Sequence, residues 1–333
     1  MIKKTINRKM DICIGGMFFP LPCFFPSIST IKTNLSPLEY LKILTASKYP
    51  LFLISAYDLY DCNKRQGQLK EIKKLLENAV NNKQIVLIDS GKYESYWKND
   101  KTWSIGKYRE ILKSIPHQIA FCYDVFKWDI DLDFQGIINN IENEVIKSQL
   151  FSNGTIVPIL HSSKKELFPK TIAKLADRLN PLIIAIPERE LGDGILERAS
   201  NVFKIRKELN KKLQYYPLHL LGTGSPLSIL IYSICGADSF DGLEWCQSTI
   251  NYDTGLLYHF QQREFFKLDQ KLQEISNLPY TELTLVYNLM FYNIWMNKIN
   301  KGFLNNNIME IVDSYLPKKM VVLLKKKLPE VFK

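Results

Sequence analysis

Short runs of hydrophobic residues recur along the chain, and each run is followed by a polar or helix-like stretch. Most of the runs are continuously apolar rather than alternating, which is typical of parallel strands that are covered on both faces. The predicted strands are 24–30, 49–57, 84–91, 118–124, 155–161, 181–188, 217–224 and 237–242. Helices are predicted between strands at 66–80, 135–149, 164–179, 194–212 and 225–235.

This alternation predicts an α/β protein built on a closed (β/α)8 barrel, the TIM-barrel architecture, over residues 24–252. An open, doubly wound parallel sheet is the alternative. Residues 1–23 form an N-terminal extension of this domain. Residues 253–333 are expected to be C-terminal helices packed on the barrel, with helical segments at 253–276, 280–300 and near 305–316.

The chain ends in a basic amphipathic segment, "LPKKMVVLLKKKLPEVFK", which begins around Pro317. One interpretation is a solvated helix face that packs through Val321, Val322, Leu323 and Leu324. The other interpretation is a basic surface that contacts the backbone of a nucleic acid. The sequence leaves both open.

Composition limits the class of protein. Of the 333 residues, 46% are hydrophobic and 12% aromatic, enough to bury a substantial core, so a disordered chain is excluded. The 44 Lys and Arg residues against 34 Asp and Glu residues give a net charge of +10, which suits a polyanionic partner such as nucleic acid.

The cysteines and histidines predict neither a disulfide framework nor a metal site. The six cysteines are scattered without a CxxC pair, which favours reduced thiols in a cytoplasmic protein. None of the four histidines lies at metal-ligand spacing from Cys or Asp, so we expect no metal and no cofactor.

The first 25 residues, "MIKKTINRKMDICIGGMFFPLPCFF", have the basic start and apolar run of a signal peptide, but Asp11, Pro20 and Pro22 interrupt the run. The sequence has no uninterrupted apolar run of about 18 residues, so we expect no membrane partner.

Polar residues follow several predicted strands at the point where each ends. In a barrel, the carboxyl ends of the strands meet at one face, which is where the chemistry of such folds is found. Taken singly, Asp89 could close a turn, and Asp124 or His161 could cap one. Their shared position, together with Asp241, favours an active site.

Five segments are informative when taken in order along the chain: "FFPSISTIKTNLSPLEYLKIL", "LIDSGKYE", "FCYDVF", "IAIPERELGDG" and, most specifically, "HLLGTGSPLSILIYSICGADSFDG". Together they resemble the tRNA-guanine transglycosylase family, over about residues 24–300. Enzymes of this family exchange a guanine base in nucleic acid for a 7-deazaguanine.

The resemblance implies a role for each matching residue. Asp241 would be the nucleophile and Asp89 the general acid and base, while Asp124 would read the polar edge of the base and Tyr93 would stack on its face. His161 falls where the family has a base-reading glutamine. The walls of the base site would be formed by Pro187, Glu188 and Arg189 on one side and by Leu221 and Gly222 on the other. Asp238, at the start of its strand, is expected to be structural.

This chemistry is physically reasonable. A carboxylate can attack an anomeric carbon to give a glycosyl-enzyme, as in retaining glycosidases. A second acid must then manage the protons of the departing and arriving bases.

Two departures from the family concern the nucleic acid. The zinc-binding cysteines and histidine of the tRNA enzymes are replaced by "QQREFFKLDQKLQEISNLPY", and their basic segment after the nucleophile is replaced by "LEWCQSTINYDTG". The sequence is therefore most similar to the DNA-acting branch of the family, which inserts bases such as preQ0 into DNA.

The expected partners are DNA and a 7-deazaguanine or guanine base, with helper proteins or a homodimer as further possibilities. A divergent tRNA-guanine transglycosylase of the queuosine or archaeosine type, acting on tRNA, is the nearest alternative. A non-catalytic nucleic-acid-binding subunit and a base-releasing glycosylase are the others.

Overall fold

A computed structural model describes residues 8–64, 68–124, 134–162, 164–268, 270–275 and 277–332. Its central feature is a parallel sheet of eight strands in the order β7-β6-β5-β4-β3-β10-β9-β8. The strands are β3 (Cys23–Ile28), β4 (Leu51–Ser55), β5 (Ile85–Asp89), β6 (Ile119–Phe121), β7 (Thr155–Val157), β8 (Ile184–Pro187), β9 (Leu218–Leu221) and β10 (Ser239–Gly242). Each of them overlaps one of the predicted apolar runs, so the strand prediction is confirmed.

The sheet curls until its two ends meet between β7 and β8. A parallel bridge joins Ile159 to Ala185. Around it, the Leu160 amide donates to the Ala185 carbonyl and the Ala185 amide to the Pro158 carbonyl, both at 2.9 Å. The sheet is therefore a nearly closed barrel, as predicted, and the open doubly wound sheet is excluded.

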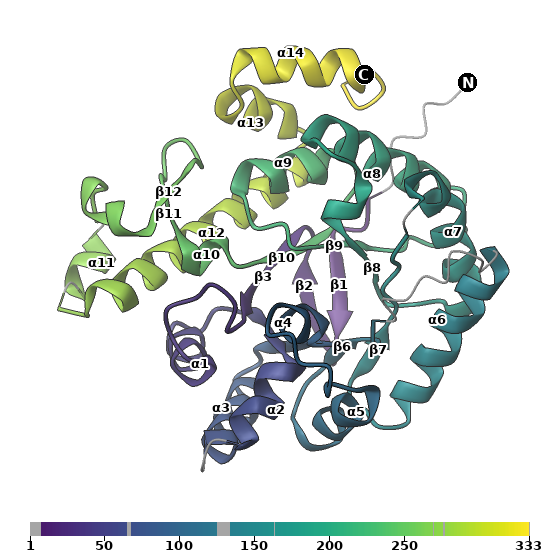
Figure 1. Cartoon of the computed structure of the whole chain (residues 1–333). Helices are drawn as coiled ribbons and strands as arrows, with labels where there is room; N and C mark the ends of the chain where they lie inside the picture. Colours follow the sequence, from purple (N-terminus) through teal and green to yellow (C-terminus); the bar gives the residue numbers. More distant parts are fainter. Residues whose placement is uncertain are drawn as a thin grey trace.

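Helices surround the barrel (Figure 1). The predicted ones are α3 (Gln68–Asn81), α6 (Phe134–Gln149), α7 (Phe168–Leu179), α8 (Ile195–Leu209) and α9 (Pro226–Ile234). The first two residues of the predicted segment 66–80 lie outside the described residues. The prediction omitted α1 (Pro37–Ala46), α2 (Ala56–Lys64), α4 (Lys92–Trp97) and α5 (Ile105–Ser114).

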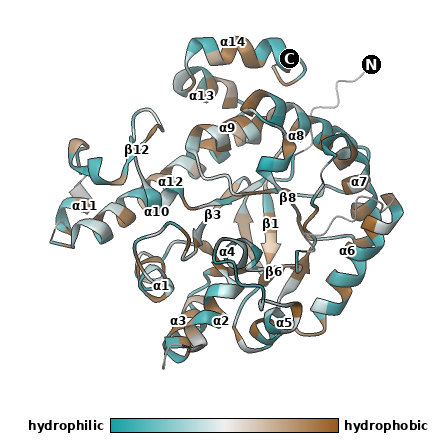
Figure 2. Ribbon diagram, viewed as in Figure 1, coloured by the Kyte–Doolittle hydropathy of each residue, from teal (hydrophilic) through white to brown (hydrophobic). Residues whose placement is uncertain are grey.

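Helix α7 illustrates why these segments are helical. Phe168, Ile172, Leu175 and Ala176 are buried, at the i, i+4, i+7 and i+8 positions that form one face of a helix. Figure 2 shows the same division around the ring, where the helices carry hydrophobic stripes and hydrophilic outer positions. The apolar face of α7 belongs to the same hydrophobic core as the barrel strands.

The N-terminal extension contains a hairpin that the sequence analysis did not predict. Strands β1 (Asp11–Ile14) and β2 (Met17–Pro20) pair antiparallel. Ile12 and Ile14 are buried in the same hydrophobic core as the barrel. The turn at Gly15 lies against Gln118, which immediately precedes β6. The hairpin therefore covers the N-terminal end of the barrel, opposite the ends where the predicted site residues lie.

The prediction of a helix over 253–276 is wrong. Strand β11 (Ser248–Ile250) pairs antiparallel with β12 (Leu257–His259), and a 3-10 turn, η3 (Phe260–Phe265), and the short α11 (Gln270–Glu274) follow. The cause is the turn "NYDTG": the Asn251 side chain accepts hydrogen bonds from the amides of Asp253 at 2.8 Å and Thr254 at 3.0 Å. This local bonding reverses the chain direction before a helix can begin.

The predicted helix at 280–300 is present as α12 (Tyr280–Leu304), and it packs on the barrel. Tyr292 stacks on Phe24 of β3 with 4.1 Å between ring centroids, and Trp295 donates through Nε1 to the Pro226 carbonyl at 3.1 Å. None of the helices in the described ranges is both long and apolar enough to span a bilayer.

Helices α13 (Ile308–Tyr315) and α14 (Lys318–Lys327) complete the chain. In α14 only part of the expected apolar face is packed. Val321 and Leu324 are buried, whereas Val322 and Leu323 are exposed.

Candidate active site

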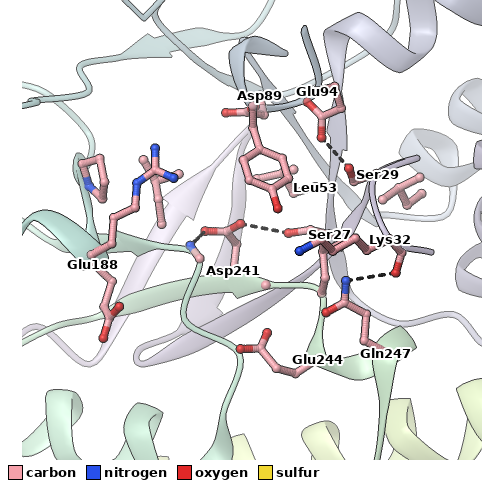
Figure 3. Close-up of a pocket in the computed structure, with 18 of the residues that line it drawn as sticks. Ser27, Ser29, Lys32, Leu53, Asp89, Glu94, Glu188, Asp241, Glu244 and Gln247 are labelled. Carbon is pink, nitrogen blue, oxygen red and sulfur yellow. Dashed lines mark hydrogen bonds between the residues drawn. The ribbon is translucent and has the colours of Figure 1, made fainter. Parts of the chain in front are cut away.

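A cavity of about 420 Å³ opens at the C-terminal end of the barrel strands. Figure 3 shows side chains from several strand ends converging on it. Every site residue expected from the sequence lines this one cavity: Asp89, Tyr93, Asp124, His161, Pro187, Glu188, Arg189, Leu221, Gly222 and Asp241. The fold therefore brings together residues that are separated by up to half of the chain.

Asp241, on β10, is buried and held by three contacts. Its Oδ2 accepts from the Ser27 hydroxyl at 2.9 Å, and its Oδ1 accepts from the Gly222 amide at 2.9 Å (Figure 3). The same Oδ1 lies 3.1 Å from Nε2 of His219. These contacts come from β3, β9 and the turn after β9, so they fix the orientation of the carboxylate from two neighbouring strands.

Gly222 explains the glycine-rich segment "GTG". Its φ of 74° lies in the left-handed region, which is unfavourable for residues that carry a Cβ atom. This conformation follows directly after β9 and turns the Gly222 amide toward Asp241. The turn therefore positions a carboxylate.

Asp89 ends β5 and faces the same cavity. Its Oδ2 accepts from the Gly91 amide at 3.1 Å. Burial, and then the negative charges of Asp124, Glu94 and Asp241, raise the pKa of Asp89 well above its usual range. A carboxyl in this environment holds a proton at a pH where an exposed aspartate has lost it.

Asp124 and His161 lie next to one another on the cavity wall. Asp124 accepts from the Ser90 hydroxyl at 3.0 Å, and its other oxygen is 3.5 Å from His161 Nε2. His161 Nδ1 is 2.7 Å from Glu190 Oε1. Burial lowers the pKa of His161, but the carboxylates of Asp124 and Glu190 outweigh it and raise the pKa to about 10. His161 is therefore an imidazolium at neutral pH.

The remaining wall is formed by α4 and by the start of η2 (Glu188–Leu191). Tyr93 is partly exposed on α4. The carboxylate of Glu188 points away from Asp241 in Figure 3. It forms an ion pair with Arg198 Nη1 of α8 at 2.6 Å and accepts a hydrogen bond from the Tyr232 hydroxyl of α9. The Glu188 carboxylate is therefore bound by residues of these two helices.

Sequence reasoning missed His219, which contacts Asp241 from behind the cavity, and several residues that line the cavity. His219 was not considered, although a polar residue within the apolar run "PLHLLG" is a signal in itself. It lies two positions before Leu221 and therefore on the same face of the strand. The omitted residues that line the cavity and carry polar groups are Ser27, Ser29, Lys32, Glu94, Glu244 and Gln247.

Two of these are acids, of which Glu94 is buried and Glu244 is partly buried. Glu94 accepts from the hydroxyls of Ser29 at 2.5 Å and Ser55 at 2.6 Å, and burial raises its pKa to about 7. Burial likewise raises the pKa of Glu244, on α10 (Glu244–Gln247), to about 7. Glu244 approaches the backbone at Gly242 so closely that a Cβ there would lie 2.4 Å from its Oε2.

Among the described residues, no group of three or more His, Cys, Asp or Glu side chains is arranged to hold a metal ion. The fold and the cavity define a class: an α/β barrel with a carboxylate-rich cavity at the C-terminal ends of its strands. No protein-family model matches the chain, and no curated protein matches it.

Proposed function

We propose that this protein is a DNA-guanine transglycosylase, which exchanges a guanine base in DNA for a 7-deazaguanine such as preQ0 through a covalent glycosyl-aspartate intermediate. The observation that carries the proposal is that Asp241 and Asp89 line the same cavity. Asp241 is oriented by three contacts, and Asp89 has a raised pKa. Two carboxyl groups in different environments suit the roles of nucleophile and proton carrier.

In the first step, a carboxylate oxygen of Asp241 attacks C1′ of the target nucleotide. The bond from C1′ to N9 of guanine breaks, and its electron pair remains on the departing base. Asp89 donates a proton to a ring nitrogen of that base, which leaves neutral guanine, an ionised Asp89 and an ester between C1′ and Asp241.

In the second step, the incoming 7-deazaguanine replaces guanine in the cavity. The ionised Asp89 takes the proton from N9 of this base, and N9 attacks C1′ from the face that guanine left. The ester bond breaks, and Asp241 is released as a carboxylate. Two successive displacements retain the configuration at C1′.

Base recognition is supported by the other lining residues. The carboxylate of Asp124 is suited to accept from the ring N–H and the amino group of guanine, and Tyr93 offers a flat surface for stacking. A volume of about 420 Å³ lies within the range of about 300–1,000 Å³ that is usual for small-molecule sites.

The choice of DNA rests on the resemblance and on charge. The net charge of +10 favours a polyanion, and no arginine follows Asp241 in "LEWCQSTINYDTG", where the tRNA enzymes hold the anticodon loop. The target nucleotide must leave its stack to reach Asp241, at a cost of a few kcal/mol unless it is already unpaired.

The test is to incubate the protein and preQ0 with duplex DNA, single-stranded DNA or tRNA, and to analyse the nucleosides of each by mass spectrometry. We expect the 7-deazaguanine in DNA, and we expect Asp241→Ala to abolish its incorporation. Asp313→Ala, which alters an exposed carboxylate on α13, is the control and should behave as the parent protein.

Each alternative has its own outcome. Incorporation into tRNA alone would support a tRNA-guanine transglycosylase. Abasic sites without incorporation would support a base-releasing glycosylase. Binding without any reaction would support a non-catalytic subunit, and full activity of Asp241→Ala would exclude it as the nucleophile.

A further inference from the structure

Two large aromatic side chains are exposed next to the cavity. On α4, Tyr96 is 75% exposed and Trp97 is 50% exposed. Tyr93, which lines the cavity, belongs to the same helix. Adjacent exposed aromatic rings are unusual on a protein surface, and beside a cavity they indicate a contact with a ligand or partner.

The three rings form a continuous path from the cavity to the surface. Tyr93 lies one helical turn before Trp97, and their ring centroids are 6.2 Å apart. Tyr96 and Trp97 follow at 5.8 Å, edge to face. A polymeric ligand with one unit in the cavity at Tyr93 would therefore contact Trp97 and Tyr96 with the units outside the cavity.

Positive charge accompanies this path. Lys32 lines the cavity, and its Nζ lies 5.0 Å above the ring of Trp97. Within the described residues, no carboxylate pairs with Lys32, whereas Lys98, at the end of α4, lies 3.4 Å from Asp58. Lys32 is thus a cation beside the rings that is available to an anion.

Flat rings and a nearby cation suit a strand that carries both flat groups and negative charge. Single-stranded nucleic acid has this character, because its bases stack on aromatic side chains while its phosphates attract lysine. A duplex keeps its base faces covered by stacking, and an apolar protein surface offers nothing for Lys32.

We propose that Trp97 and Tyr96 form a stacking strip for the unpaired bases that flank the target nucleotide, with Lys32 contacting a phosphate. This inference rests on the proposed function for the kind of partner, and it adds that the substrate is single-stranded at the site of exchange.

The direct test measures affinity for a fluorescein-labelled oligodeoxythymidine by fluorescence anisotropy. This probe has no guanine, so binding is measured apart from the reaction. We expect Trp97→Ala to weaken binding about tenfold, and Tyr96→Ala to weaken it by a similar or smaller factor. Trp97→Phe keeps a ring for stacking and should restore most of the affinity.

The matched control is Phe18→Ala, which removes an aromatic ring that is 73% exposed on β2, in the hairpin at the opposite end of the barrel. Thermal unfolding of all variants verifies that they fold. An unchanged affinity of Trp97→Ala for the probe, or no binding of the probe by the parent protein, would overturn the inference.

Exchange kinetics separate this inference from the proposed function. With a guanine-containing single strand, Trp97→Ala should raise KM for the oligonucleotide and leave KM for the incoming base unchanged. An unchanged KM for the oligonucleotide would reject the stacking strip and leave the exchange reaction standing. If Trp97→Ala loses probe binding while the parent protein exchanges no base in any nucleic acid, the stacking strip is supported and the proposed exchange reaction is rejected.

Discussion

His219 links two side chains of β10 from the neighbouring strand. Its Nδ1 lies 2.7 Å from the Ser239 hydroxyl, and its Nε2 lies 3.1 Å from Asp241. The imidazole is fully buried and packs near the rings of Phe25 and Phe121. It is not among the residues that line the cavity and contacts Asp241 from behind, so we infer that it positions Asp241, the proposed nucleophile.

His219→Phe keeps the ring packing and removes both polar contacts. A nucleophile that is less well held reacts more slowly, so we expect kcat for base exchange to fall about a hundredfold with little change in KM for the incoming base. His219→Gln, which can still donate to Asp241, should retain more activity. A kcat equal to that of the parent in His219→Phe would contradict the positioning role.

His161 makes the stability of the site depend on pH. Its pKa is about 10 in the folded protein, compared with 6.5 for a histidine in an unfolded chain. A raised pKa means that the ion pairs with Asp124 and Glu190 contribute their full stability below pH 6.5, and that this contribution is lost as the pH rises through 10.

The comparison of the parent with His161→Gln tests this directly by urea unfolding at a series of pH values. The difference in the free energy of unfolding should be constant just below pH 6.5 and should decrease steadily between pH 6.5 and 10. A difference that does not vary over that range would show that His161 is neutral in the folded protein.

At the scale of elements, the two aspartates of "GADSFDG" have different tasks. Asp238 precedes β10, is fully buried, and meets Arg206 of α8 at 2.6 Å. It also meets Arg8 at 2.9 Å and accepts from the Tyr215 hydroxyl at 2.6 Å. The expectation that Asp238 is structural is confirmed, because these contacts join β10 to α8 and to the N-terminal segment.

Replacing Asp238 would leave Arg206 buried without its carboxylate. We expect Asp238→Ala to lower the free energy of unfolding by about 3–5 kcal/mol, because removing one partner of a buried ion pair leaves the other charge buried without compensation. Denaturant unfolding measures this, with Asp313→Ala as a control that should unfold like the parent. A loss below about 1 kcal/mol would mean that Arg206 finds other partners.

The strands could be predicted because strands covered on both faces leave a simple signature, an unbroken apolar run. The segment 253–276 could not, since its aromatic residues suggest a packed helix while one side chain, Asn251, determines the turn. The strand-end acids were predictable from their position. Glu94 was not, because it reaches the cavity from an unpredicted helix, α4. The contact of His219 with Asp241 depends on the register of β9 beside β10, which the sequence does not reveal.

At the scale of the whole molecule, charge is divided between surface and site. The chain carries a net charge of +10, yet acids dominate the titratable groups of the cavity. Burial, together with repulsion from neighbouring carboxylates, raises the pKa of Asp89 and of Glu244. This division suits the proposed function, in which a net positive charge favours a polyanionic partner and an acidic cavity keeps a proton available for the departing base.

The hairpin β1–β2 has a kinetic consequence. It covers the N-terminal end of the barrel, side chains fill the interior of a barrel of this size, and the cavity lies at the C-terminal ends of the strands. If the protein exchanges bases as proposed, we expect the departing base to leave at this end of the barrel, where its replacement also enters. Exchange should therefore follow ping-pong kinetics, with parallel double-reciprocal lines and free guanine competing against the incoming base. Intersecting lines would mean that both bases are bound at once.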